Sequence, residues 1–151
     1  ADISIRASKL KGITLNPKLV PNLIDELPVL FIAASLAEGE TIIRGAEELR
    51  EKESDRLEAM SNSLKLLGVK FKIYDDGIDI QGLNQEVHTS NSGMPFEASR
   101  INSFGDHRIA MTSAIACTRA NEKSYIEDTK NVTTSFPNFL EICEEVGLDI
   151  K

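Results

Sequence analysis

The sequence repeats one order of hydrophobic patterns at a spacing of about 80 residues, and such a repeat is typical of a chain built from copies of one supersecondary unit. Asp25 and Asp106 open equivalent apolar helices, and Gly68 and Gly147 end equivalent second helices. Each copy runs helix, strand, helix and then strands. Because strands alternate with helices, we expect right-handed crossovers and parallel pairing. The repeat therefore predicts an α/β fold with about two copies of the unit.

Four helices are expected where apolar residues recur at helical spacing. They cover Leu23–Ala37, Asp55–Leu67, Asp106–Ala120 and Phe139–Val146. The first is apolar on almost all faces, which predicts a buried helix. Pro28 falls in its first turn, where proline is tolerated.

Short runs rich in β-branched residues predict the strands. They cover Ile3–Ala7, Ile13–Asn16, Thr41–Arg44, Val69–Tyr74, Ile78–Gln81, Met94–Ser99 and Ser124–Asp128, with another strand beginning at Leu148. Asp75-Asp76-Gly77 separates two of these runs and is the strongest hairpin signal in the sequence. The segment from Leu83 to Gly93 is polar and typical of turns.

The composition excludes some classes of function. The 151 residues suffice for one domain with a core. A net charge of −7 and the absence of Trp argue against a nucleic-acid partner. No apolar run reaches membrane-spanning length, so no membrane partner is expected. A small anionic ligand stays possible, because a basic cleft can lie on an acidic protein.

Cys117 and Cys143 are the only cysteines, and each lies within an apolar helical pattern. We interpret them as reduced thiols, which predicts a cytoplasmic protein. A zinc site needs more Cys or His ligands than the sequence offers. We therefore expect neither a metal nor a cofactor.

Two charged clusters precede predicted helices. Lys52-Glu53-Ser54-Asp55-Arg56 comes before the second helix, and Asp106-His107-Arg108 opens the third. Backbone N–H groups at a helix N-terminus favour anions. Two such clusters in a small chain indicate a site for a ligand with several negative charges.

Each of these residues also has a purely structural interpretation. Asp25 is suited to cap its helix, Lys52 can pair with Glu48 four residues earlier, and a single His107 is more often structural than catalytic. The functional interpretation is that arginines grip a phosphate or carboxylate, with Glu53 placed for proton transfer. The residue types alone leave both interpretations open.

Four stretches occur in an informative order and spacing: Leu23–Pro28, Glu48–Arg56, Asp106–Met111 and Thr134–Pro137. Together they resemble the 5-enolpyruvylshikimate-3-phosphate synthase family, the sixth enzyme of the shikimate pathway, along nearly the whole chain. The resemblance implies repeated βαβαββ units that form an inside-out α/β barrel. It also implies enolpyruvyl transfer from phosphoenolpyruvate to the 5-hydroxyl of shikimate 3-phosphate, as a 3-phosphoshikimate 1-carboxyvinyltransferase.

The resemblance assigns a role to several residues. Asp25 is a candidate base that contacts the shikimate 5-hydroxyl, and Lys52 lies near that hydroxyl and the reacting centre. Glu53 is the proposed acid that protonates the methylene carbon of phosphoenolpyruvate.

Among the remaining site residues, Arg56 and Arg108 correspond to arginines that hold phosphoenolpyruvate, with His107 beside them. One departure from the pattern is Thr134, where some members of the family carry a Lys. This replacement puts one phosphate contact in doubt.

The resemblance covers only part of the family's pattern, and the chain begins without Met. We therefore expect a partial C-terminal segment of one domain of a two-domain synthase, monomeric when complete. Half of a two-domain cleft cannot enclose both substrates, so no turnover is expected from residues 1–151 alone. The alternatives are a relative of UDP-N-acetylglucosamine enolpyruvyl transferase and a non-catalytic anion-binding module.

Overall fold

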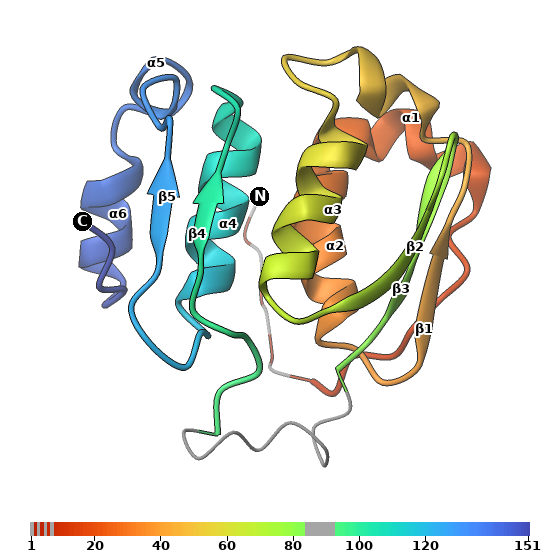
Figure 1. Cartoon of the computed structure of the whole chain (residues 1–151), viewed down its shortest axis with the longest axis horizontal. Helices are drawn as coiled ribbons and strands as arrows, with labels where there is room; N and C mark the ends of the chain where they lie inside the picture. The colour runs from red at the N-terminus through yellow and green to blue at the C-terminus, as the bar shows by residue number, and fades with distance from the viewer. Residues whose placement is uncertain (1, 3, 5, 7, 84–92) are drawn as a thin grey trace.

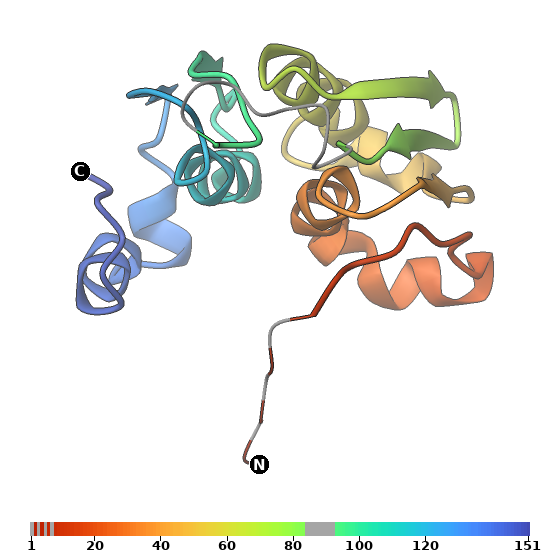
Figure 2. The same cartoon turned by 90° about the horizontal axis from the view of Figure 1, so that it is seen from below.

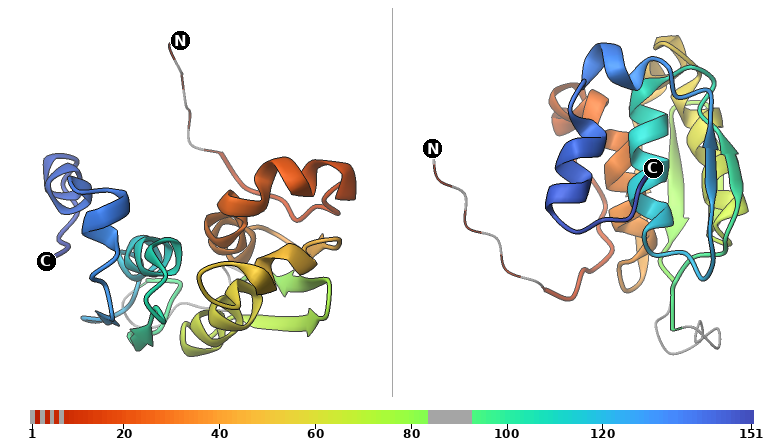
Figure 3. Two further views of the ribbon diagram at one scale, coloured as in Figure 1. Left: turned by 90° about the horizontal axis from the view of Figure 1, so that it is seen from above. Right: turned by 90° about the vertical axis from the view of Figure 1, so that its left-hand side faces the viewer.

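The computed structural model describes residues 2, 4, 6, 8–83 and 93–151. Three helices that pack against one another form its centre: α2 (Leu27–Ser35), α3 (Arg56–Leu66) and α4 (His107–Cys117). Sheets lie outside these helices, one on each side in the view of Figure 1. Seen from above, the three helices stand side by side, almost end-on to the viewer (Figure 3).

The larger sheet has the strand order β1-β3-β2, with β1 (Glu40–Ile43), β3 (Gly77–Gln81) and β2 (Lys70–Tyr74) all antiparallel to their neighbours. The smaller sheet pairs β4 (Arg100–Asn102) in parallel with β5 (Tyr125–Glu127). Short helices complete the fold: η1 (Pro17–Leu19), α1 (Val20–Leu23), η2 (Ile24–Glu26), η3 (Glu47–Glu51), α5 (Val132–Ser135) and α6 (Phe139–Glu145). Figure 2 shows α6 away from the three central helices.

Two parallel pairings each have a central helix between their partners in the chain. Residues 13–15 run parallel to β1, with a bridge between Thr14 and Ile42, and α2 lies between the two segments in the chain. β4 and β5 are likewise parallel, with α4 between them. The expected α/β class is therefore confirmed. That the two halves superpose as copies of one unit stays a prediction.

The apolar faces predicted by the helical periodicity do form the core. Leu27 and Phe31 of α2, Met60 of α3 and Ile109 of α4 are all fully buried. On the sheet side, Ile78 and its neighbours on β1 and β3 cover these helices. Burying each of these side chains contributes about 1.5–3 kcal/mol, which holds the helix starts at fixed positions.

The helices start and end close to the predicted residues. Asp55 caps α3 by accepting the Glu58 N–H at 2.9 Å, and Asp106 caps α4 by accepting the Arg108 N–H at 2.9 Å. Gly68 and Gly147 follow α3 and α6 with φ of 82° and 83°, as expected of residues that end helices. The first predicted helix is correct over α2, but it begins with the tighter turn η2.

The strand predictions are less accurate. The hairpin of β2 and β3 is confirmed. The strand predicted at Met94–Ser99 is wrong except at Phe96, which forms one isolated parallel bridge with Ala120, and the paired strand β4 starts at Arg100. The strand predicted from Leu148 is also wrong, since no partner lies beside it in the part of the chain that the structure describes. Three of the five residues of the strand predicted at Ile3–Ala7, and most of the turn-rich segment from Leu83, lie outside the described residues.

Candidate functional site

The N-terminal ends of the three central helices lie at the same end of the molecule, at the top of Figure 1. They bring together η2 before α2, the loop of residues 52–55 before α3, and the first turn of α4. Hydrogen bonds connect residues that are 31 to 83 positions apart in the sequence. The sequence clusters therefore meet because the three central helices pack together with their N-termini at the same end.

Arg56 is the centre of this cluster. Its guanidinium donates to Asp106 Oδ2 at 2.8 Å, to Asp25 Oδ1 at 2.9 Å and to Glu53 Oε2 at 2.6 Å. The side chain is only 1% exposed, and Asp106 is fully buried. Ser54 Oγ donates to the same Asp106 oxygen at 3.1 Å. One guanidinium thus ties together the starts of all three helices.

The electrostatics of this pair favour the charged forms. Burial by itself disfavours both charges, but the hydrogen bond and the attraction between the partners outweigh it. As a result the pKa of Arg56 is raised, with Glu53 and Asp25 adding to the effect. The pKa of Asp106 is lowered, with help from the Arg108 N–H and Ser54. Asp106 and Arg56 are therefore an ion pair at neutral pH.

Arg108 and Lys52 lie on the more exposed side of the cluster. Arg108 Nη1 donates to the backbone oxygen of Asp25 at 2.9 Å and to Glu26 Oε1 at 3.0 Å. Lys52 forms an ion pair with Glu48, and its Nζ lies 3.9 Å from Asp25 Oδ1. Because the paired carboxylates are exposed, a competing anion can reach these cations at little cost.

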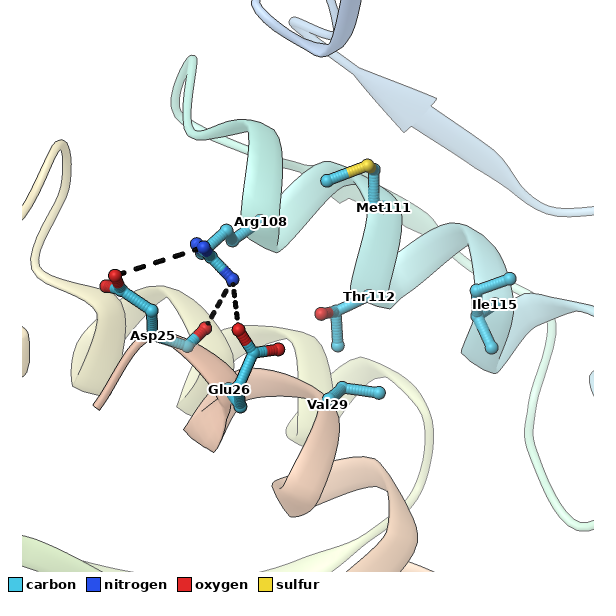
Figure 4. A pocket seen from close by; sticks show the side chains of 7 residues that line it. All are labelled: Asp25, Glu26, Val29, Arg108, Met111, Thr112 and Ile115. Carbon is cyan, nitrogen blue, oxygen red and sulfur yellow. Dashed lines mark hydrogen bonds and ion pairs between the residues drawn. The ribbon is translucent and has the colours of Figure 1, made fainter. Parts of the chain in front are cut away.

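A small cavity of about 150 Å³ adjoins this cluster between α2 and α4. Figure 4 shows Asp25, Glu26 and Arg108 at one end of it, joined by hydrogen bonds and ion pairs. The other walls are mostly apolar, with Val29 on α2 and Met111 on α4. The polar end therefore adjoins an apolar wall, and electrostatic interactions are stronger beside apolar groups than in water.

The structure brings together six of the predicted residues: Asp25, Lys52, Glu53, Arg56, Asp106 and Arg108. It does not join His107 to them: in the described chain, His107 is the half-buried first residue of α4 and has no hydrogen bond or ion pair to the cluster. Asp25 does not cap α2, since its carboxylate is directed to Arg56 instead. The structural interpretation of Lys52 pairing with Glu48 is confirmed.

Two further residues are missed by the sequence reasoning. Glu26 holds Arg108, and its only signal is its place next to Asp25. Arg50 binds the α3 cap residue Asp55 at 2.7 Å. It lies within one of the four informative stretches, but its other partners come from the distant hairpin and cannot be inferred from local spacing.

The charges of the cluster do not balance. Five carboxylates (Asp25, Glu26, Glu48, Glu53 and Asp106) face three cations (Lys52, Arg56 and Arg108). A ligand with several negative charges would be repelled by this excess unless further cations were added. What the cluster can supply itself is proton transfer, since the Glu53 carboxylate is 52% exposed and is held by the Arg56 guanidinium.

The comparisons with known proteins agree on one family. A family model described as EPSP synthase (3-phosphoshikimate 1-carboxyvinyltransferase) matches residues 1–143. The 3-phosphoshikimate 1-carboxyvinyltransferase of Ruthia magnifica subsp. Calyptogena magnifica is 49% identical over 150 residues, covering 99% of this chain and 32% of the relative. The corresponding protein of Coxiella burnetii (strain RSA 493 / Nine Mile phase I) is 46% identical, covering all of this chain and 32% of the relative.

A solved structure extends the similarity to three dimensions. EPSP synthase from Acinetobacter baumannii, at 2.37 Å, matches with a TM-score of 0.85 and 43% identity. The match covers 95% of this chain and 32% of that chain. The chain thus spans about a third of the length of these three proteins.

Proposed function

The chain belongs to the EPSP synthase family, and we propose that it forms part of an enzyme that transfers the enolpyruvyl group from phosphoenolpyruvate to the 5-hydroxyl of shikimate 3-phosphate. The observation that carries the proposal is the meeting of Asp25, Lys52, Glu53 and Arg108 at one end of the central helices. Because the chain spans about a third of its relatives' length, the activity is proposed for a longer protein that contains these residues.

The reaction needs both an acid and a base. The hydroxyl oxygen of shikimate 3-phosphate attacks C2 of phosphoenolpyruvate, while C3 gains a proton and becomes a methyl group. In the resulting tetrahedral intermediate, loss of a C3 proton and departure of phosphate then restore the double bond. Groups within hydrogen-bond reach must therefore move protons at the hydroxyl and at C3.

Exposure decides which residues suit these steps. Glu53 and Asp25 are 52% and 48% exposed, so both carboxylates can reach a ligand while their positions are fixed by Arg56. We assign proton transfer at C3 to Glu53 and proton removal from the hydroxyl to Asp25. Lys52, which lies near Asp25, stabilises negative charge that develops at the attacking oxygen.

The two arginines are not equivalent in this structure. Arg108 is 30% exposed, and its partner Glu26 is 62% exposed, so an incoming phosphate or carboxylate can replace that partner. Arg56 is buried, and its guanidinium already binds three carboxylates. A direct contact of Arg56 with phosphoenolpyruvate therefore requires the guanidinium to give up Glu53 or Asp25, and the proposal includes that exchange.

The excess of carboxylates supports the view that the site is completed by residues outside this chain. Both substrates are multiply anionic, so the remaining part of the enzyme has to supply cations. We expect no metal or cofactor in this chemistry. Within the part of the chain that the structure describes, no helix is long and apolar enough to cross a membrane. A cytoplasmic location and a monomeric state remain predictions.

The proposal is tested with Glu53→Gln in the full-length enzyme. This change keeps the shape and the hydrogen bond to Arg56 but removes the ionisable group. We expect kcat to fall by roughly 10²–10⁴, the range of a lost general acid, with little change in the affinity for shikimate 3-phosphate. Phosphate release measures the rate.

Glu51→Gln is the matched control. Glu51 is exposed and lies two residues from Glu53, and its side chain has no hydrogen bond or ion pair among the described residues, so this variant should keep wild-type turnover. Near-wild-type kcat in Glu53→Gln would remove Glu53 from the mechanism. Since the matching family model and the two bacterial relatives are EPSP synthases, the UDP-N-acetylglucosamine enolpyruvyl transferase alternative is not retained.

A further inference from the structure

Arg50 makes three hydrogen bonds to two distant parts of the chain. It is 28% exposed and lies near the end of η3, two residues before Lys52. Its Nε donates to the backbone oxygen of Asp75 at 2.9 Å, and its Nη2 donates to the backbone oxygen of Tyr74 at 2.9 Å. Its Nη1 donates to Asp55 Oδ2 at 2.7 Å. All three nitrogens of the guanidinium therefore have an acceptor.

The acceptors are fixed by their own contacts. Asp55 caps α3 through its other oxygen, which accepts the Glu58 N–H at 2.9 Å. The two backbone oxygens belong to the tight turn that joins β2 and β3. Arg50 thus connects the start of a central helix to the end of the larger sheet.

The same hairpin turn also holds the beginning of this segment. The Ala46 N–H donates to the backbone oxygen of Asp76 at 2.7 Å, and the Gly45 N–H donates to the Asp76 carboxylate at 3.3 Å. Residues 45–50 are therefore attached to the turn at both ends, and Asp55 is linked to the turn through Arg50. Between Arg50 and Asp55 the backbone has no helix or strand after Glu51.

This short irregular stretch carries Lys52 and Glu53. The Arg50–Asp55 ion pair joins its two ends, which are only five positions apart in the sequence. Neither Arg50 nor Asp55 is among the residues to which we assign a substrate contact, yet the loop between them carries the Glu53 carboxylate and the Lys52 ammonium. A displacement of about 1 Å at such groups can lower a rate about 10²-fold.

We propose that Arg50 is a positioning residue for the transfer reaction, which holds the Lys52–Glu53 loop by bridging the α3 cap to the β2–β3 turn. This inference rests on the proposed function. The role requires arginine, because its planar fork reaches acceptors in different directions. A lysine offers one point of attachment and cannot satisfy the carboxylate and both backbone oxygens together.

The test is Arg50→Lys in the full-length enzyme, with Asp55→Ser as an independent variant. Serine keeps a side-chain acceptor for the helix cap but removes the carboxylate that Arg50 binds. For both variants we expect kcat per active site to fall by about 10- to 100-fold. KM for shikimate 3-phosphate should change by less than about threefold, because most contacts that bind this substrate stay in place.

Arg44→Lys is the matched control. Arg44 forms an ion pair with Asp79 of β3 at 2.7 Å and lies over the Tyr74 ring, so it braces the same hairpin. It has no hydrogen bond or ion pair to residues 47–55 within the described chain. Its kcat should therefore remain that of the wild type, even if thermal stability decreases.

Hydrogen exchange gives a second measurement that does not depend on turnover. In Arg50→Lys the amide of Glu58, which donates to Asp55 Oδ1 at 2.9 Å, should exchange faster, while those in the middle of α3 keep their protection. Equal kcat losses in Arg50→Lys and Arg44→Lys, or a kcat within twofold of wild type in Arg50→Lys, would overturn the inference. If the wild-type enzyme shows no synthase turnover, the proposed function fails instead. Unchanged exchange at Glu58 would then still refute the positioning role.

Discussion

The Arg56–Asp106 ion pair sets the properties of the site at the scale of single residues. Both side chains are almost completely buried, and Asp106 also caps α4. A buried pair of this kind adds little net stability compared with an apolar pair, but removing one partner leaves an uncompensated charge. The pair therefore restricts how α3 and α4 can be placed relative to each other.

The first prediction concerns Arg56→Met. This change leaves Asp106 buried without its cation, so we expect the free energy of unfolding to fall by roughly 3–5 kcal/mol. Urea denaturation measures it. As a control, Arg108→Met removes a cation that is 30% exposed and paired with an exposed carboxylate, and should cost about 1 kcal/mol or less. Equal losses of unfolding free energy in the two variants would contradict the conclusion that Arg56 stabilises the fold more than Arg108 does.

The second prediction is a pH dependence caused by Asp106. Its pKa is lowered below the ordinary value of 3.8 in the folded protein, so the unfolded chain binds a proton first as the pH falls. The stabilisation is complete above about pH 5 and is lost as the pH falls through 3.8 to the lowered folded pKa. Asp106→Asn should therefore flatten the decrease in stability between about pH 5 and about pH 2.

Asp79 sets the control for this measurement. Its pKa is also lowered, chiefly by its hydrogen bond to Arg44, so part of the acid dependence should survive in Asp106→Asn. Thermal unfolding at a series of pH values separates the two contributions. An Asp106→Asn variant with an unchanged pH profile would show that folding does not lower the pKa of Asp106.

At the scale of elements, helices are predicted more accurately than strands, for a physical reason. The apolar spacing and caps that define α3 and α4 lie within the helices themselves. A strand of three residues such as β4 is defined by its partner, which is far away in the sequence. Pro95 lacks the N–H that a strand at Met94–Ser99 would need, and the apolar run from Leu148 does not pair within the described residues.

The hairpin is predicted correctly from Asp75-Asp76-Gly77, but the reason for the glycine differs from the one assumed. Asp75 and Asp76 form the turn, and Gly77 is already paired with Tyr74 in the ladder. A Cβ on Gly77 would lie 2.0 Å from the backbone oxygen of Ile43. Glycine is therefore required here by the close approach of β3 to β1.

The third prediction follows from that contact. Gly77→Ala should force β1 and β3 apart and lower the free energy of unfolding by roughly 1–3 kcal/mol or more. Gly39→Asn is the control, because Gly39 has φ of 87° and a Cβ added there would meet no atom within 4 Å, and Asn tolerates this backbone region. Chemical denaturation compares the two, and a Gly77→Ala variant as stable as the control would refute the close-contact argument.

At the scale of the whole molecule, the sequence predicts which charged residues meet but not how they share their contacts. The clusters at Lys52–Arg56 and Asp106–Arg108 meet because both precede packed helices. The burial of Arg56 could not be predicted, because it depends on three carboxylates from different segments. The same holds for Arg50, whose acceptors are backbone oxygens of a distant turn.

The unbalanced charge of the cluster also belongs to this scale. The described residues include the carboxylates proposed for proton transfer and two partly exposed cations, Lys52 and Arg108, while carboxylates outnumber cations. The substrates of the proposed reaction are anionic, and like charges in a partly buried site repel. The proposed function therefore predicts that residues outside this chain complete the site.

The most direct test of this requirement is to measure phosphate release from phosphoenolpyruvate in the presence of shikimate 3-phosphate. The full-length enzyme and a protein of residues 1–151 alone are compared at equal concentration. We predict turnover that depends on both substrates in the full-length enzyme and no turnover in the shorter protein. Absence of turnover in the full-length enzyme, or synthase activity from residues 1–151 alone, would contradict the proposed function.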